Sequence, residues 1–367
     1  MAWLFLFSGR WPFPSHWPAF YWYWHGHEMV FGFAGAVIAG FLLTSVPNWT
    51  GTAALRGAPL VGLVGVWLAG RAALWGVGWL PAAVVAGVDL LFFPLLIAAV
   101  APPIARAGKP RNYPLPLLLL LLFCTNLVMH LQAAGMLGGD LRTTVHLAVY
   151  VVVAVVAVIS GRITPVFTQN ALRRRGRDVE VPSRPVVDGL AMLAMVIAVL
   201  LDLASEGSRA SGLAFLVAAG LLLARQWPWR FRDALPDPLV WILHVAHAWL
   251  VVGFAAKGLS ALLGVFPLAT AFHALSAGAI GTAVLGVMSR VALGHTGREL
   301  RAAPVTVVAY ALLLLGALIR VLGPVAAPSA YLQMAVLGGC VWGSAFVLFL
   351  VVYTPILTRP RPDGKPG

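Results

Sequence analysis

The chain has 367 residues, of which 60% are apolar and only 10% charged, and its formal net charge is +13. Soluble domains carry about a quarter charged residues, so this composition excludes an ordinary soluble globular protein. About 20 consecutive apolar residues cross a bilayer core as one helix, and such stretches recur along the whole chain. The sequence therefore predicts an all-α, polytopic transmembrane bundle, because lipid cannot satisfy open backbone groups.

The apolar stretches predict about eleven spans, or twelve if residues 1–24 contribute one. The spans are expected near 29–47, 59–79, 81–101, 114–137, 143–161, 185–203, 210–225, 239–260, 271–293, 304–323 and 331–353. The predicted organisation is an aromatic outer-face segment over 1–28, a transmembrane bundle over 29–357 and a cytoplasmic tail over 358–367. Asp237, directly before Pro238, is expected to be an N-cap.

The basic residues alternate from loop to loop. They gather after the odd-numbered spans, most densely in RRRGR at 173–177, and the intervening loops hold few. By the positive-inside rule, odd-numbered spans run from outside to inside and the C-terminal tail is cytoplasmic. This orientation accounts for the net positive charge, so nucleic acid is not an expected partner and the lipid bilayer is.

Several histidines are expected at one depth near the outer face. They are His25, His27, His130, His146 and His273. Neutral imidazole is a common ligand of haem iron and of copper. A single histidine at this depth is more often interfacial, but histidines on four spans predict a metal layer, because polar groups within membrane spans usually face a functional interior.

The first two of these histidines are two residues apart. On a helix they point to nearly opposite sides, so we expect His27 rather than His25 to face the bundle. Glu28 either fixes the tautomer of His27 or simply favours the positive helix N-terminus. Asp89 lies near mid-bilayer, where an unpaired charge is costly. We expect it to pair with Arg71 or Lys257, as structure or as a proton route.

Two further groups are candidates for chemistry. His244 and His247 share one face of the eighth span and predict a second metal site, unless they only hydrogen-bond across helices. At the inner ends, Arg162 and Arg290 suit carboxylates such as haem propionates, or else snorkel to anchor helix ends. His295 is a further candidate ligand there. Asn48 and Asn170 are expected to cap helix ends.

Three out-to-in segments share a pattern. Each begins with histidine and ends in a polar stretch at the same separation: His27 to Gly51, His146 to Asn170, and His273 to Gly297. Four helices separate successive members. The pattern predicts a pseudo-threefold repeat of four-helix units, although nine histidines also allow it by chance.

Several long motifs resemble the NnrS family of bacterial membrane proteins, in family order over nearly the whole chain. They are WHGHEMVFGFAGAVIAGFLLTSVPNWTG, GRITPVFTQN, LHVAHAWL, FHALSAGAIGTAVLGVMSRVALGHTGR and YTPILTRPRPDGKPG. The resemblance implies an inner-membrane helical bundle that contains haem, expected to be b-type, and copper. It also implies a role in nitric oxide metabolism or in protection from nitrosative stress.

The resemblance also carries over particular residues. They are His25, His27, Glu28, Asn48, Trp49, Arg162, Asn170, His244, His273, Arg290, His295 and Arg298. The family has a tyrosine-like residue where this chain has His247, so the carry-over favours His244. The family's GFRPFF-like opening is not recognisable in MAWLFLFSGRWPFP, which leaves the total number of helices open.

These observations favour a haem-binding membrane protein, with copper as a further expected metal, that handles nitric oxide. We expect His27, His146 and His273 to form the outer metal layer, with His244 next; catalytic residues and enzyme activity stay unassigned. The alternatives are a transporter or channel for a metal, haem or small anion, and an electron-transfer or reductase subunit with an unidentified redox partner. PNWTG and TPVFTQN suggest the discontinuous helices of carriers.

Overall fold

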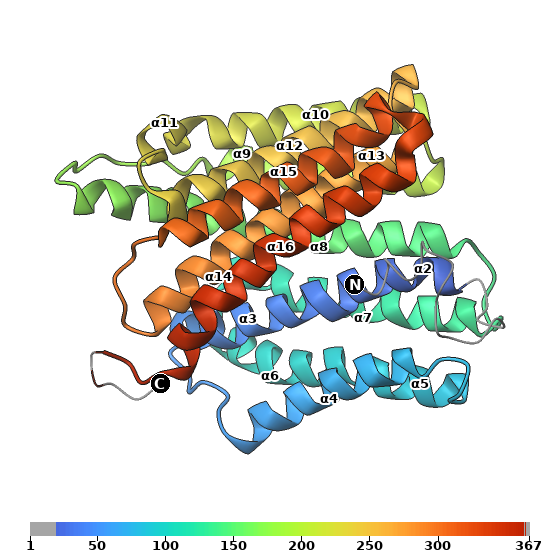
Figure 1. Cartoon of the computed structure of the whole chain (residues 1–367), viewed down its shortest axis with the longest axis horizontal. Helices are drawn as coiled ribbons and strands as arrows, with labels where there is room; N and C mark the ends of the chain where they lie inside the picture. The colour runs from blue at the N-terminus through green and yellow to red at the C-terminus, as the bar shows by residue number, and fades with distance from the viewer. Residues whose placement is uncertain (1–19, 363, 365–367) are drawn as a thin grey trace. The chain divides into compact units, whose positions relative to one another are not determined.

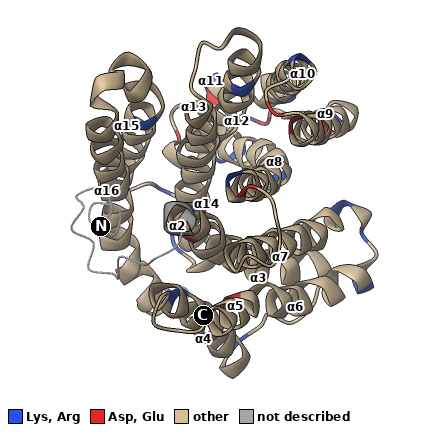
Figure 2. Cartoon of the chain, turned by 90° about the vertical axis from the view of Figure 1, so that its right-hand side faces the viewer, with Lys and Arg blue, Asp and Glu red and all other residues tan. Residues whose placement is uncertain are grey.

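The computed structural model describes residues 20–362 and residue 364. The chain is 82% helical, and its described residues form no strand, which confirms the all-α class. Eleven helices among the described residues are long and apolar enough to cross a membrane, as predicted. Figure 2 shows that most of each helical ribbon carries neither acidic nor basic residues. Residues 1–19 of the expected outer-face segment (1–28) lie outside the described residues. From Phe20 onward the segment is helical.

The chain divides into two compact units, Met1–Val155 and Val156–Gly367. In the first unit, helices lie side by side with roughly aligned axes (Figure 1). Its elements are α2 (Phe20–His27), η1 (Glu28–Ala34), α3 (Gly35–Thr50), α4 (Ala58–Trp75), α5 (Ala82–Leu90), α6 (Phe92–Ala107), η2 (Pro110–Asn112), α7 (Pro114–Ala133) and the first part of α8 (Leu141–Arg174).

The second unit begins within α8 and contains the remaining helices. They are α9 (Pro185–Ala204), α10 (Arg209–Gln226), η3 (Trp227–Trp229), α11 (Phe231–Ala234), α12 (Pro238–Leu263), α13 (Leu268–His273), η4 (Ala274–Ile280), α14 (Gly281–His295), α15 (Pro304–Ala326), η5 (Pro328–Ala330) and α16 (Tyr331–Thr358). Among them, α10 packs between α9 and α12, and α15 packs along α16.

Helix starts follow the expected residues. Pro114, Pro238 and Pro304 each occupy the first position of a helix. The Asp237 carboxylate accepts a hydrogen bond from the Leu239 N–H at 3.1 Å, which confirms the predicted N-cap. Proline is favoured at this position because its missing N–H would have no partner within the helix.

Two expectations about helix ends are wrong. Asn48 and Asn170 lie inside α3 and α8, and neither caps an end. The Asn48 side chain donates within its own helix, to the Thr44 carbonyl at 3.0 Å. Gly51 ends α3 instead, because its φ of 72° is the left-handed conformation that glycine adopts without strain.

The stretch GRITPVFTQN is also continuous helix. α8 runs from Leu141 to Arg174 with Pro165 inside it, and α3 runs through Pro47. Proline is tolerated in membrane helices because neighbouring groups and local adjustments re-satisfy the freed carbonyl. The expected helix breaks at PNWTG and TPVFTQN are therefore absent from α3 and α8, and the carrier alternative loses the observation on which it rested.

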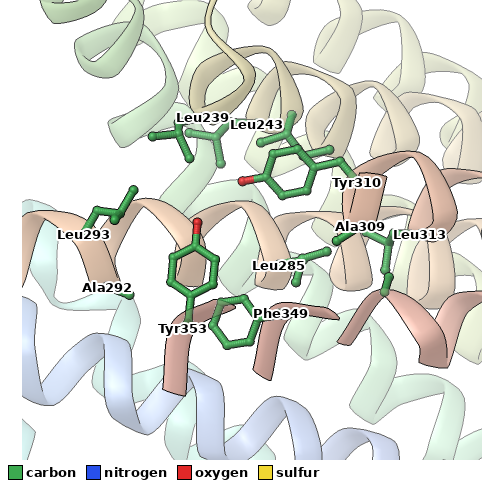
Figure 3. Close-up of a cluster of buried hydrophobic side chains, with 12 residues drawn as sticks. Leu239, Leu243, Leu285, Ala292, Leu293, Ala309, Tyr310, Leu313, Phe349 and Tyr353 are labelled. Carbon is green, nitrogen blue, oxygen red and sulfur yellow. The ribbon is translucent and has the colours of Figure 1, made fainter. Parts of the chain in front are cut away.

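A buried apolar cluster joins α12, α14, α15 and α16 in the second unit (Figure 3). Leu243, Leu285 and Leu313 are buried within it, and the Phe349 and Tyr353 rings stack with centroids 4.5 Å apart. The Thr306 hydroxyl donates to the Tyr353 hydroxyl oxygen at 3.3 Å. Packing at this density resists sliding of one helix along another. The cluster thereby fixes the register of α12 against α14.

Two of the three repeat segments share an unusual backbone. A seven-residue π-helix follows His27 and another follows His273, and each leads into a glycine, Gly35 or Gly281. Both segments later end at a glycine with positive φ, Gly51 and Gly297. α8, which carries His146, has no such widened turn. The backbone thus repeats between the first and third members of the predicted pattern.

Candidate functional site

Two histidines and a carboxylate from three helices converge inside the first unit. His27 ends α2, Asp89 lies on α5 and His130 lies on α7, and all three are buried. One ligand atom from each lies within 4.8 Å of the others. Asp89 Oδ2 is 3.2 Å from His27 Nε2 and 3.0 Å from His130 Nε2. We call these three residues the histidine–carboxylate centre.

Small residues make room for this centre. A Cβ on Gly70 of α4 would lie 3.1 Å from Asp89 Oδ1, and a Cβ on Gly32 would lie 2.8 Å from Arg71 Nη1. A methyl group at Gly70 would crowd the backbone and carboxylate of Asp89, and one at Gly32 would push on the guanidinium that contacts both carboxylates. Gly32 belongs to η1. Its carbonyl accepts a hydrogen bond from Trp67 Nε1 at 3.0 Å.

Arg71 joins the centre to a second carboxylate. It donates from Nη1 to Glu28 Oε1 at 2.5 Å and from Nη2 to Asp89 Oδ1. This confirms the expected pairing of Asp89 with Arg71; Lys257 pairs with Asp202 in the second unit, at 2.9 Å. One guanidinium faces two carboxylates, so the group carries one negative charge in excess unless a ring proton or a metal ion balances it.

Hydrogen bonds define where the protons of the centre lie. Asn126 donates from Nδ2 to Asp89 Oδ2 at 2.8 Å, and its carbonyl oxygen lies 2.9 Å from His27 Nε2. That nitrogen therefore carries a proton, since an amide oxygen only accepts. His27 Nδ1 faces Glu28 Oε1 at 3.3 Å, which is again an acceptor. Both ring nitrogens thus face acceptors, and the cluster accommodates a cation at His27.

The other histidines expected in the outer layer lie differently. His25 is exposed while His27 is fully buried, in line with their two-residue spacing. His146 is half-buried on α8 and is not one of the three residues whose ligand atoms converge. His273 belongs to the second unit, where its Nδ1 donates to the Ala269 carbonyl at 2.6 Å.

His244 and His247, the predicted pair on α12, are both buried. The two imidazole rings have different hydrogen-bond partners. His247 Nε2 donates to the Leu222 carbonyl at 3.3 Å, so its Nδ1 only accepts. The Ser160 hydroxyl has one proton to share between this nitrogen at 3.0 Å and the Ala157 carbonyl at 3.3 Å. The Thr168 hydroxyl donates its single hydrogen bond to the Thr164 carbonyl at 2.8 Å. Its oxygen therefore accepts from His244 Nε2, 2.9 Å away, which leaves a lone pair on His244 Nδ1. That nitrogen is buried and has no hydrogen-bond partner among the described residues.

The remaining predicted residues lie in the later parts of α3, α8 and α14 or directly beyond them. Arg290 is buried, with its guanidinium 4.1 Å from the Phe167 ring centroid, and Arg162 is half-buried. His295 is exposed, and its carbonyl accepts from Arg361 at 2.7 Å. Two further residues make backbone contacts: Lys109 donates to the Trp49 carbonyl at 2.7 Å, and Arg298 donates to Thr296 and Pro360 at 3.4 Å.

Sequence reasoning missed two polar residues that shape these sites. Asn126 lies four residues before His130, a spacing that places both on one face of α7 and was a usable signal. Arg225, the last residue of the expected span 210–225, is buried in the second unit. It donates to Asp188 and to the Ala157 carbonyl, both at 2.7 Å, in a space left open by Gly161. Apolar residues on both sides of Arg225 were the available signal.

The fold and the centre together define a class of protein: a multi-pass helical membrane protein with a buried imidazole–carboxylate cluster suited to a metal ion. Comparison with known proteins then gives the family. The model of the NnrS protein family matches residues 1–361, and the chain belongs to that family. Family membership supports a role linked to nitric oxide. Neither the curated proteins nor the solved structures contain a significant match.

Proposed function

We propose that this protein binds a transition metal ion, copper first, at the histidine–carboxylate centre, and uses it in nitric oxide metabolism or in protection from nitrosative stress. The observation that carries the proposal is the convergence of His27, Asp89 and His130 from three separate helices. Buried titratable groups inside membrane spans are costly and usually functional. With His27 neutral, the cluster carries one negative charge in excess, and a metal ion that displaces the ring proton of His27 would balance it.

The donor set fits a bare metal ion. Imidazole nitrogens and carboxylate oxygens bind transition metals at about 2.0–2.2 Å, so ligand atoms sharing one ion lie about 3–4 Å apart. The three ligand atoms lie within 4.8 Å of one another, so modest side-chain rotation brings them into range. Imidazole suits copper, iron and zinc. Two imidazoles with one carboxylate are the open triad of non-haem iron(II) sites, so it is the family resemblance, and not the donor set, that favours copper.

The same centre does not fit a haem. Asp89 Oδ2 contacts both rings, at 3.2 and 3.0 Å, so a porphyrin has no space between His27 and His130 as they lie. A copper ion at the centre would supply one-electron chemistry. The chain itself orients the imidazoles through Asn126 and Glu28, excludes water by burial, and holds Asp89 in place through Arg71.

The proposed setting is the bacterial inner membrane with the C-terminal tail in the cytoplasm, on the strength of the loop charges. Nitric oxide is small and uncharged, so it reaches a buried centre through lipid and apolar side chains without a polar entrance. Among the alternatives, carriers lose support through the continuity of α3 and α8. An electron-transfer role would need a docking site for a donor, for which the described residues offer no specific observation.

The test is metal content measured on purified full-length protein, together with nitric oxide decay in membrane vesicles. His27→Ala, Asp89→Asn and His130→Ala should each lower bound copper and slow nitric oxide decay. His25→Ala is the matched control, because His25 is exposed and lies two residues from His27. Copper retained in full by all three centre variants would overturn the proposal, as would an equal loss in His25→Ala.

A further inference from the structure

The connections that follow α8 and α10 are joined to each other at one end of the second unit. Arg177 of the first connection donates to Asp233 of the second at 2.8 Å. Trp229 of the second connection is buried in one apolar cluster with Val181 of the first. α11, within the second connection, packs beside α12 (Figure 1). We call residues 173–184 and 227–235 the paired loops.

The paired loops carry more cations than their own acids balance. They contain seven arginines and three acidic residues. Four of the arginines form ion pairs: Arg173, Arg174, Arg177 and Arg230. Three more are exposed and form no ion pair with any described residue: Arg175, Arg184 and Arg232. Their guanidinium groups are therefore open to an anionic partner from outside the chain.

Exposed apolar side chains accompany these cations. Trp227 is 80% exposed, and Phe231 and Leu235 are exposed as well. Trp229, two residues beyond Trp227, is buried, so the segment turns one tryptophan into the protein and the other away from it. Tryptophan gathers at membrane–water boundaries, because its ring is apolar and its N–H is polar. Trp227 beside exposed arginines is therefore suited to the level of lipid headgroups.

The backbone of Arg230 is strained at this surface. Its φ of 59° and ψ of 49° are left-handed, and no other described residue except glycine has a positive φ. The turn ends η3 and begins α11, and it leaves Trp227 and Phe231 exposed on either side of it in the chain. Glycine adopts this conformation without strain, so an arginine here adds a charge at an energetic cost. Its contact with Asp233 is long, at 3.4 Å.

We propose that the paired loops bind an anionic phospholipid, with their arginines at its phosphate and Trp227 at the level of its headgroup. The proposal goes beyond the metal-dependent function and does not rest on it. Arginine presents a planar fork of donors that matches phosphate oxygens. Each basic residue near an anionic membrane surface strengthens binding by about fivefold, or about 1 kcal/mol. The three arginines without ion pairs supply this attraction, and Trp227 supplies the apolar contact that a soluble anion lacks.

Two residues of the first unit serve as matched controls. Arg56, in the loop between α3 and α4, is exposed and forms no ion pair with any described residue. Trp79, between α4 and α5, is 63% exposed. Basic loop charge that only orients the helices predicts the same small effect at Arg56 as at Arg232. A lipid-binding surface predicts an effect at Arg232 and at Trp227, and none at the two controls.

The test uses full-length protein in neutral detergent, titrated with phosphatidylglycerol, with the bound lipid counted by native mass spectrometry. Arg232→Gln should weaken phosphatidylglycerol binding by about fivefold and flatten its dependence on salt, because one screened charge is lost. Trp227→Ala should weaken binding and leave the salt dependence as in wild type, because no charge changes. Arg56→Gln and Trp79→Ala should bind as wild type does.

The source of the anion and the folding of the variants are separated by further measurements. Phosphatidylcholine should bind far more weakly than phosphatidylglycerol, and inorganic phosphate should not displace the bound lipid. Arg230→Gly should keep the circular dichroism of wild type, because it relieves the strained backbone, and should still weaken phosphatidylglycerol binding. Equal binding of the two lipids would overturn the proposal. So would unchanged binding in Arg175→Gln with Arg232→Gln, an equal loss in Arg56→Gln, displacement by inorganic phosphate, or binding of an acidic soluble protein by a surface that retains no phosphatidylglycerol.

Discussion

Replacing Lys257 by methionine tests how the second unit carries a buried charge. Lys257 on α12 and Asp202 on α9 form an ion pair at 2.9 Å, and their side chains are 2% and 7% exposed. Lys257→Met leaves the Asp202 carboxylate buried without its cation. Breaking a buried pair from one side costs about 3–5 kcal/mol, so we expect that loss in the free energy of unfolding.

The reverse change should cost less, because each partner is supported differently. In Asp202→Asn, the amide oxygen can still accept from the Gly207 N–H, which lies 3.3 Å from Asp202 Oδ1. Lys257 would keep Glu206 at 4.0 Å and the faces of Phe215 and Phe272 at 5.8 and 5.3 Å. Each cation–π contact contributes about 0.5–2 kcal/mol, so we expect a loss of about 1–2 kcal/mol.

The double variant completes the cycle. Lys257→Met with Asp202→Asn removes both charges, and we expect it to lie within about 1 kcal/mol of wild type. Unfolding in mixed micelles of increasing SDS fraction, followed by circular dichroism, gives the three free energies and hence the coupling energy. Additive losses, or a cost below 1 kcal/mol for Lys257→Met, would refute the argument that burial makes this pair mutually dependent.

Two smaller predictions concern packing and pH. Gly161→Ala should destabilise by about 1–3 kcal/mol because its methyl group would meet the Arg225 guanidinium, whereas Gly220→Ala, with open space around it, should be neutral or stabilising in the same SDS titration. In the loop region, Arg177 donates to Asp233 at 2.8 Å and holds the pKa of that carboxyl below its ordinary value. Asp233→Asn should therefore lower the melting temperature slightly at neutral pH. The difference should begin to shrink as the pH falls through about 4, where the unfolded carboxyl takes up its proton, and should vanish only below the lowered pKa of the folded carboxyl. A difference that grows on acidification would contradict this.

The helices were predictable because membrane spans are specified by composition. Eleven apolar stretches became eleven candidate spans, and prolines marked several starts correctly. The ends were less predictable, because they depend on local backbone choice. Gly51, and not Asn48, ends α3, and α8 continues through Pro165, which membrane helices tolerate.

The site was predictable only in part. The two-residue spacing separated buried His27 from exposed His25. The cost of a buried charge predicted a cation beside Asp89, either Arg71 or Lys257, and the structure places Arg71 there. The grouping of His27 with His130 depends on which helices are neighbours, and a single sequence does not encode that directly. The hydroxyl partners of His244 and His247, Thr168 and Ser160, lie on α8, and a single sequence does not show that α8 and α12 meet there.

The π-helical segments after His27 and His273 bear on how such sites tolerate change in length. A π turn closes its hydrogen bonds one residue later than an α turn, so it behaves as an α-helix carrying an inserted residue. Removing one residue from Glu28–Ala34 would let the segment relax to regular α-helix, and the residues on either side would keep their faces, because the wide turn takes up the extra residue within itself. His27 would then still face Asp89. A one-residue deletion in a regular α-helical stretch, by contrast, turns everything before it by about 100° around the axis. The widened turn thus marks the place in this helix where a change in length leaves the cluster in register.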